Sequence, residues 1–232
     1  MILCIFQARV GSERLKKKIL KKIYGKTILE HQLLRFARSK MITKLVVATT
    51  KNKNDDITEK IASDLGYDVF RGDTTNVLKR YIDCAKLYKA KTIVRACGDD
   101  PLIDIEIIDQ MIKIQKKNNY DFVSNVVNRT FPLGLDSTIL KTEILNKIPT
   151  LTKDKFHYEN VVTYLEHEYK KFNYFFYDKP KDRYSGMRWT LDYEEDFKFI
   201  KKIYSLLYKN KPDFNFKDVL EVIDEYKIKG NY

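Results

Sequence analysis

The chain predicts an α/β fold in which helices cover both faces of a mostly parallel sheet. Short, continuous apolar runs alternate with segments of helical periodicity from residue 2 to about residue 125. Strands that are apolar throughout, rather than at every second residue, are typical of parallel sheets buried on both faces. Because such sheets place their ligands beyond the carboxyl ends of the strands, the segments that follow the strands are the first places to look for function.

Seven apolar runs predict the strands of this sheet. They lie at 2–6, 45–49, 67–71, 92–97, 121–125, 172–177 and 187–191. Apolar residues that recur every three or four positions mark the inner faces of the helices. These faces are Leu29, Leu33, Phe36 and Ala37; Ile57, Ile61 and Leu65; Leu78, Tyr81, Ile82 and Ala85; Ile108, Met111, Ile112 and Gln115; and Phe216, Val219, Leu220, Ile223 and Tyr226.

The length of 232 residues suits one domain, because single domains commonly contain about 100 to 250 residues. Beyond residue 125 the alternation of strands and helices loosens. Pro132, Gly134 and Pro149 interrupt the stretch 129–155, which predicts loops rather than long elements. We therefore expect a single domain over 1–232, with a loop-rich region at about 126–185 that could form a lid, bind a ligand or contact a second copy of the chain.

The excess of basic residues raises the alternative of an RNA-binding protein. The formal charge is +12, from 44 Lys and Arg against 32 Asp and Glu, and clustered cations bind phosphate backbones. Only 10 of the 44 are arginines, and the lysines are spread through nearly every polar segment. Because such a distribution is typical of solvated helix faces, no nucleic-acid partner is expected.

Cysteine content and hydropathy indicate which cellular compartment the chain occupies. Cys4, Cys84 and Cys97 are odd in number and lack a C-x-x-C pair, so neither a disulfide framework nor a zinc cluster is indicated. No apolar run reaches the roughly 18 residues that a membrane span needs, and no basic leader precedes a long apolar stretch. We expect a cytoplasmic protein without a membrane partner.

The loop that follows the first strand has the composition of an anion site. Gly11 and Ser12 can let backbone N–H groups approach a ligand, while Arg9, Arg14 and Lys18 can converge on negative oxygens. A polyphosphate is the ligand that suits these groups, since Arg binds phosphate oxygens in pairs and Lys supplies a compact charge. The loop contains neither the Walker A pattern nor G-x-G-x-x-G, so the nucleotide site that it predicts is of another kind.

Two aspartates follow other predicted strands and suggest a metal. Asp99 comes directly after the run that ends at Cys97, and Asp192 follows the run that ends at Leu191. Each could instead cap a helix or form a turn, and Asp192 with Glu195 three residues later fits a capping arrangement. Taken together with the basic loop, two acids at the same sheet edge predict a magnesium and triphosphate site.

These stretches, in this order, resemble the cytidylyltransferase family of the spore-coat polysaccharide type and, more distantly, the enzymes that activate 3-deoxy-manno-octulosonate and acylneuraminates with CTP. The family opening Q-A-R-x-x-S-x-R-L-P-G-K-x-L is similar to QARVGSERLKKKIL at 7–20. Lys18 stands at the family lysine, and Lys16 and Lys17 replace Pro and Gly. GDDPLID at 98–104 resembles G-D-x-P-L-I-D, and RWTLDYEEDF at 188–197 resembles R-x-T-x-D-x-x-E-D followed by a hydrophobic residue.

Two further stretches extend the resemblance over nearly the whole chain. They are VFRGDTTNVLKRY at 69–81 and HYENVVTYL at 157–165. The resemblance implies a nucleotide-diphospho-sugar transferase fold, a three-layer α/β/α sandwich with a Rossmann-like nucleotide half. It also implies transfer of CMP from CTP to a small acidic sugar or phosphorylated acceptor, with Mg²⁺ as cofactor, for cell-surface polysaccharide or capsule synthesis. A homodimer is compatible with it.

The resemblance also carries residue roles. Catalysis is expected from Arg14, Lys18 and Asp99, and Mg²⁺ binding from Asp99 and Asp192. Nucleotide binding is expected from Gln7, Ala8, Arg9, Gly11, Ser12, Gly72, Arg80 and Gly98. Acceptor binding is expected, by position and partial match, from Ser124, Asn125, Arg129, Gly134 and Glu159.

A metal-dependent glycosyltransferase of the same general fold is the competing enzyme hypothesis. It would also use a nucleotide and a metal-binding aspartate. Its donor would be a sugar nucleotide, however, and it would not need a basic loop for a triphosphate tail. The identity of the donor therefore separates the two.

Overall fold

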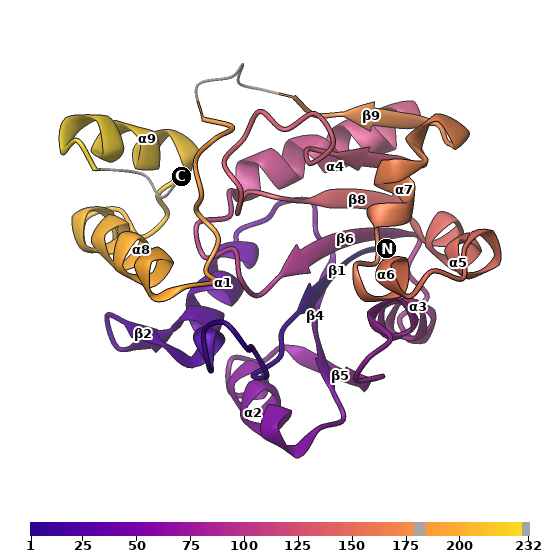
Figure 1. The fold of residues 1–232 in the computed structure, drawn as a ribbon, viewed down its shortest axis with the longest axis horizontal. Helices are drawn as coiled ribbons and strands as arrows, with labels where there is room; N and C mark the ends of the chain where they lie inside the picture. The colour runs from indigo at the N-terminus through magenta and orange to yellow at the C-terminus, as the bar shows by residue number, and fades with distance from the viewer. Residues whose placement is uncertain (179–183, 229–232) are drawn as a thin grey trace.

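The computed structural model describes residues 1–178 and 184–228. Seven strands form one sheet in the order β5-β4-β1-β6-β8-β7-β9, and helices lie on both sides of it (Figure 1). The strands are β1 Ile2–Gln7, β4 Lys44–Thr50, β5 Asp68–Gly72, β6 Thr92–Cys97, β7 Phe122–Ser124, β8 Thr138–Lys141 and β9 Tyr174–Phe176. A separate two-stranded hairpin joins β2 Lys22–Ile23 to β3 Lys26–Thr27.

The sheet is mostly parallel, as the sequence predicted. β1 pairs in parallel with β4 on one side and β6 on the other, and β5 continues the parallel array beyond β4. Of the seven strands in the described residues, β8 alone runs against its neighbours β6 and β7, while β7 and β9 are parallel. The carboxyl ends of β1, β4 and β6 therefore meet at one edge.

Helices cover both faces, which completes three layers. The face that holds Cys4, Phe6 and Val94 packs against α1 Ile28–Phe36, α2 Asp56–Asp64, α4 Ile105–Asn118, α8 Glu194–Leu207 and α9 Phe216–Glu225. The face that holds Ile5 and Ile93 packs against α3 Val77–Leu87, α5 Thr142–Leu151 and α7 Thr163–His167. The short α6 Lys155–Glu159 and the 3₁₀ turns η1 Lys18–Leu20, η2 Lys53–Asp55 and η3 Tyr169–Lys171 complete the described elements. None of the described helices combines the length and the apolar composition of a membrane span.

Six of the predicted strands are confirmed, but the strand predicted at 187–191 is wrong. Its apolar residues are buried, yet its one strand-type pairing is an isolated bridge between Leu133 and Arg188. It crosses the edge of the sheet instead of joining it. A buried segment outside a sheet and a buried strand show the same apolar pattern. The pattern depends on burial and does not show which segment the backbone is hydrogen-bonded to.

The loop-rich region contains more regular structure than predicted. β8 and α5 both lie within 129–155, where three helix-breaking residues suggested loops. Pro149 lies within α5, two residues before the helix ends at Leu151, and because it has no N–H it removes one helical hydrogen bond. A strand as short as β8 offers too few residues for a pattern to be detected.

Candidate active site

A cavity of ≈ 470 Å³ opens at the carboxyl edge of the sheet, between the ends of β1 and β6. The loop after β1, the end of β6, the start of α3 and the end of α6 surround it. Its lining residues are Gln7, Ala8, Arg9, Gly11, Ser12, Glu13, Arg14, Lys18, Ile19, Val77, Arg95, Cys97, Gly98, Asp99, Glu159 and Asn160. The predicted catalytic residues, six of the predicted nucleotide residues and Glu159 thus share one cavity.

The loop after β1 is held in place by Asp55, which the sequence analysis did not single out. Its carboxylate accepts a hydrogen bond from the Val10 amide at 2.7 Å and a second from the Thr50 hydroxyl. Asp55 is only 3 % exposed, so both bonds are shielded from water. Asp55 thereby links the end of β4 to the middle of the loop. In the sequence, the signal for this role is an acid that follows a buried strand.

Gly11 and Gly98 play different parts in the same cavity. A Cβ atom on Gly11 would meet nothing within 4 Å, so the loop leaves open space beside its backbone. A Cβ on Gly98 would lie 3.1 Å from the Gln7 carbonyl oxygen, to which the Gly98 amide donates at 2.8 Å. Gly98 therefore lets the ends of β1 and β6 approach closely.

A left-handed residue directly precedes Lys18, the lysine predicted to be catalytic. Lys17 has φ 54° and ψ 33° directly before η1, a conformation that glycine adopts without cost and other residues do not. The family pattern has glycine at this position. The lysine found here keeps the geometry, and Lys18 is directed inward with only 9 % of its surface exposed.

Lys18 lies between the two aspartates predicted to bind metal. Its ammonium nitrogen is 3.1 Å from Asp99 Oδ2 and 2.9 Å from Asp192 Oδ1. Burial lowers the pKa of Lys18, but the charges and hydrogen bonds of the two aspartates outweigh it and raise the pKa above its ordinary value. Lys18 is therefore charged at neutral pH, and two carboxylate oxygens converge on one positive charge.

Asp192 is the most heavily paired acid in this group. Arg14 Nη2 donates to its Oδ1 at 2.8 Å, and Arg188 Nη2 donates to its Oδ2 at 2.7 Å. Burial raises the pKa of Asp192, but the hydrogen bonds from Lys18 and Arg188 and the Arg14 charge lower it below the ordinary value. Arg188, which the sequence analysis quoted but did not assign, also donates to Asp196 at 3.2 Å.

The extended segment 187–191 brings Asp192 beside Asp99. The Leu191 amide donates to the Asp99 carbonyl at 2.7 Å, and the Trp189 amide donates to the Leu133 carbonyl at 2.6 Å. Gly134 is required here because its φ is +111° and a Cβ would lie 2.5 Å from the Thr190 nitrogen. Segment 187–191, wrongly predicted as a strand, thus crosses the edge of the sheet and places the predicted acid Asp192 near Asp99.

Neither aspartate caps a helix. The Asp104 carboxylate accepts from the Glu106 and Ile107 amides at the start of α4. In the first turn of α8, the Asp196 carboxylate accepts from the Asp192 and Tyr193 amides, which precede the helix. The capping arrangement considered for Asp192 is therefore wrong, and its side chain is directed to the cations instead.

Gly72 and Arg80, both predicted to bind nucleotide, do not line the cavity. Arg80 is fully buried and donates to the Asp73 carbonyl at 2.8 Å. A Cβ on Gly72 would lie 2.7 Å from the Arg80 side chain, so this glycine makes room for it. Burial lowers the pKa of Arg80, and the neighbouring Arg9 lowers it further.

Four of the five predicted acceptor residues also lie outside the cavity lining. Asn125 donates to the Leu135 carbonyl at 2.7 Å and accepts from the Ser137 amide at 2.8 Å. Arg129 forms a two-point ion pair with Asp136 at 2.6 and 2.9 Å. The Ser124 hydroxyl accepts from Thr138 Oγ1, and Gly134 packs against segment 187–191. Their acceptor roles stay predictions.

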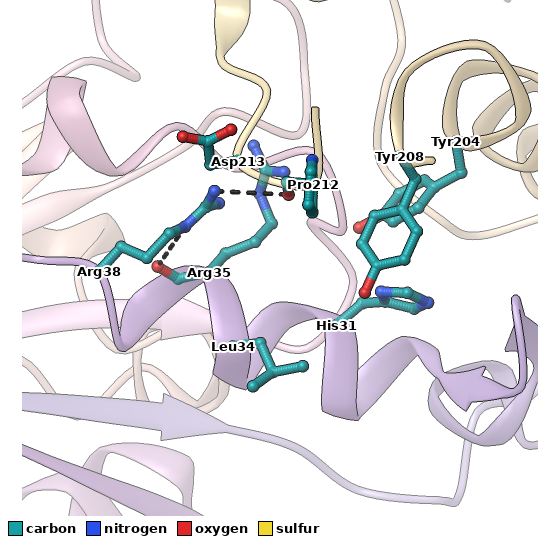
Figure 2. A pocket seen from close by; sticks show the side chains of 8 residues that line it. All are labelled: His31, Leu34, Arg35, Arg38, Tyr204, Tyr208, Pro212 and Asp213. Atoms are coloured by element: carbon teal, nitrogen blue, oxygen red, sulfur yellow. Dashed lines mark hydrogen bonds between the residues drawn. The ribbon is translucent and has the colours of Figure 1, made fainter. Parts of the chain in front are cut away.

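A second hollow, of ≈ 200 Å³, lies between α1 and the region after α8 (Figure 2). Figure 2 shows His31 and Arg35 on α1 facing Tyr208 and Pro212 across it. Arg35 donates to the Ile103 and Phe214 carbonyls at 2.8 and 2.9 Å, and its guanidinium lies 4.4 Å from the centre of the Phe214 ring. These contacts fasten α1 to two distant segments. The described linings of the two hollows share no residue.

Structural comparison defines the class of protein. A cytidylyltransferase from Leptospira borgpetersenii serovar Hardjo-bovis has a TM-score of 0.93 at 34% identity, covering 100% of this chain and 98% of that one. CMP:2-keto-3-deoxy-manno-octonic acid synthetase in complex with CTP has a TM-score of 0.68 at 14% identity, covering 88% of this chain and 98% of that one. The chain therefore shares its α/β fold with both of these proteins.

Sequence comparison defines the family. The cytidylyltransferase family profile matches residues 3–217. The spore coat polysaccharide biosynthesis protein SpsF of Bacillus subtilis strain 168 is 29% identical over 231 residues, which is 96% of this chain and 94% of that protein. The chain belongs to the cytidylyltransferase family, and the resemblance found in the sequence is confirmed.

Proposed function

We propose that the chain transfers CMP from CTP to a small acidic sugar or phosphorylated acceptor, with release of pyrophosphate, in the synthesis of a cell-surface polysaccharide. One observation carries the proposal: Lys18 lies between Asp99 and Asp192 at a cavity lined by the Gly-Ser loop. Membership of the cytidylyltransferase family and the name of the B. subtilis relative support the nucleotide and the pathway.

In the proposed reaction an acceptor oxygen forms a bond to the α-phosphorus of CTP. The bond from that phosphorus to the bridging oxygen breaks, and pyrophosphate leaves with the electron pair. Arg14 and Lys18 would stabilise the charge that develops on pyrophosphate, while Arg9 and the backbone beside Gly11 and Ser12 would hold the nucleotide. All five of these residues line the cavity.

The residues present also fit a divalent cation. Asp99 Oδ2 and Asp192 Oδ1 already converge on a single ammonium group, and carboxylate oxygens are the ligands that Mg²⁺ prefers. Cys97 lies close to Asp99 and Asp100, but a thiolate is a soft ligand that suits other metals. Asp99 and Asp192 would therefore hold Mg²⁺, which would supply neutralisation of phosphate charge.

A pyrophosphate-release assay tests this function. The purified protein is incubated with Mg²⁺ and a panel of sugar acids and polyol phosphates, with CTP, UTP, ATP or a sugar nucleotide as donor. We expect release with CTP alone among these donors, and a higher melting temperature in CTP. Binding of RNA with a steep salt dependence, together with no response to CTP, would contradict the proposal.

A further inference from the structure

Three cations share the carboxylate of Asp192, but they bind different oxygens. Lys18 Nζ and Arg14 Nη2 lie 2.9 and 2.8 Å from Oδ1, whereas Arg188 Nη2 lies 2.7 Å from Oδ2. Lys18 and Arg14 line the cavity, and its described lining includes neither Arg188 nor Asp192. Oδ1 therefore faces cations that border the cavity, and Oδ2 faces a cation that does not.

Arg188 is held in place at both its backbone and its guanidinium. The Leu133 amide donates to the carbonyl of the preceding Met187 at 2.9 Å, and the amide of the following Trp189 donates to the Leu133 carbonyl at 2.6 Å. Arg188 Nε donates to Asp196 Oδ1 at 3.2 Å, and only 22 % of the arginine side chain is exposed. The guanidinium therefore has a fixed place before any ligand binds.

Asp196 joins this guanidinium to the backbone that carries Asp192. Its Oδ2 accepts from the Asp192 and Tyr193 amides, both at 2.8 Å, and its side chain is only 3 % exposed. Hydrogen bonds to a buried charged group are stronger than neutral ones and are shielded from water. The backbone and the carboxylate of Asp192 are thus oriented by the same two residues, Arg188 and Asp196.

The cations on Oδ1 are anchored less firmly. Among the residues that the structure describes, the Lys18 ammonium donates only to Asp99 and Asp192, and the Arg14 guanidinium donates only to Asp192. A cation whose bonds all go to these carboxylates can exchange with another cation, whereas Arg188 has an independent anchor. Oδ1 is therefore the oxygen of Asp192 that is open to exchange.

We propose that Arg188, held by Asp196, is a positioning residue that fixes Oδ2 of Asp192 and leaves Oδ1 to the divalent cation. This inference rests on the proposed function, in which Asp99 and Asp192 hold Mg²⁺. Groups that hydrogen-bond to the ligands of a metal orient those ligands. Arginine suits this task because its planar group stays charged and donates in several fixed directions, so that it binds two carboxylates at once.

Binding of Mn²⁺ without turnover provides the first test. Mn²⁺ replaces Mg²⁺ as a probe, and electron paramagnetic resonance measures the free ion in the presence of CTP and without an acceptor. A sample of CTP alone corrects for the ion that the nucleotide binds. Arg188→Lys keeps the positive charge and loses the planar group, so a change in affinity reports orientation rather than charge. We expect the dissociation constant for Mn²⁺ to rise about 10–100-fold.

Arg71 is the matched control. It bonds two carboxylates, those of Asp56 and Glu59, and its side chain is 24 % exposed, but it is not among the described lining residues of the cavity. Arg71→Lys should leave the dissociation constant for Mn²⁺ unchanged. If Arg188→Lys and Arg71→Lys lower the melting temperature alike and neither changes Mn²⁺ binding, Arg188 is structural and the inference is overturned.

A double-mutant cycle tests whether Arg188 and Asp196 act together. Asp196→Asn keeps an acceptor for the two backbone amides and removes the charge that holds Arg188. Each single variant should weaken Mn²⁺ binding, and the double variant should weaken it no more than the stronger single variant, because both residues act through one carboxylate. Additive effects would show that the two residues act independently and would overturn the proposal.

Steady-state kinetics separate this inference from the proposed function. In Arg188→Lys we expect kcat to fall at low Mg²⁺ and to recover as Mg²⁺ is raised, while the KM for CTP at saturating Mg²⁺ stays within about twofold. Unchanged Mn²⁺ binding in Arg188→Lys, with pyrophosphate release intact, would overturn the inference and leave the proposed function standing. No rise in melting temperature with CTP and no pyrophosphate release with any acceptor would contradict the proposed function.

Discussion

The two sides of the cavity hold their charges in opposite ways. On the side of the loop after β1, Lys18 and Arg14 pair with Asp192, and Lys18 also pairs with Asp99. On the side of β6, Arg95 is partly buried and forms no ion pair among the described residues, and its Nε is buried without a hydrogen bond. A paired network holds its cations in place before any ligand binds, whereas a cation without an ion pair can still gain one. The difference indicates that the two sides of the cavity are not equally preorganised.

The largest expected effect concerns the paired side. Asp99→Asn removes one negative charge from the network and should lower kcat by about 10²–10³, by analogy with the loss of one preorganised charged or polar group. Pyrophosphate release measures this. Asp83→Asn is the control, because Asp83 lies on the exposed face of α3 in an ion pair with Lys79. A kcat for Asp99→Asn close to that of the control would remove Asp99 from the chemistry.

The next effect concerns the support of the loop. Asp55→Ala leaves the Val10 amide and the Thr50 hydroxyl without their acceptor, and should lower the free energy of unfolding by about 1–3 kcal/mol. The KM for CTP should rise, because the loop loses its attachment to β4. Urea unfolding and kinetics measure the two effects. Asp64→Ala, which removes an exposed ion pair with Lys60, should change neither.

Glu166 predicts a pH dependence of stability of opposite sign to that of a paired acid. Burial raises the pKa of Glu166 above its ordinary value of 4.5, so the folded state binds a proton that the unfolded state has released. Glu166 therefore lowers stability as the pH rises from 4.5 through its folded pKa. Glu166→Gln does not titrate, so it should be more stable than wild type at neutral pH, on the order of 0.5–1 kcal/mol.

Urea unfolding of wild type and Glu166→Gln between pH 4 and pH 8 measures this difference. The two proteins should converge at the acid end of the range. The pKa of Asp192 is lowered in the folded state. Its contribution to stability is therefore present above its ordinary pKa and is lost as the pH falls through the folded pKa. A stability difference for Glu166→Gln that grows toward low pH would contradict a raised pKa of Glu166.

The smallest effect concerns the turn before Lys18. Lys17→Gly removes the cost of a left-handed lysine but adds the entropy of glycine in the unfolded chain, so the net stabilisation should be about 0.5 kcal/mol. Lys16→Gly is the matched control, because the φ of Lys16 is not positive and the glycine should therefore destabilise. Equal melting temperatures for the two variants would show that the turn is not strained.

The parallel half of the sheet was predictable because its signals are local. β1, β4 and β6 are largely buried on both faces and show as apolar runs, while β5 is a half-buried strand at the edge of the sheet. The loop with Arg14 and Lys18 follows the first of them directly, so its place at the sheet edge followed from the fold class. The grouping of Lys18 with Asp99 was expected for the same reason.

The second half was less predictable because its contacts are distant in sequence. β8 is short and antiparallel, and segment 187–191 looks like a strand while its hydrogen bonds go to Leu133 and Asp99. Arg95 had a signal, a charge inside an apolar strand, but its meaning depended on which face it shares and whether an acid lies near. Asp55 likewise acts on a loop that precedes it by more than forty residues.

The sequence by itself determined the α/β class, the order of the first strands, the basic loop and the two acids, because burial and turn chemistry leave local patterns of residues. Only the tertiary structure decided that Asp192 and Asp99 meet at Lys18 and that Asp55 supports the loop. These facts depend on where segments far apart in the chain cross one another, and no local pattern records such a crossing.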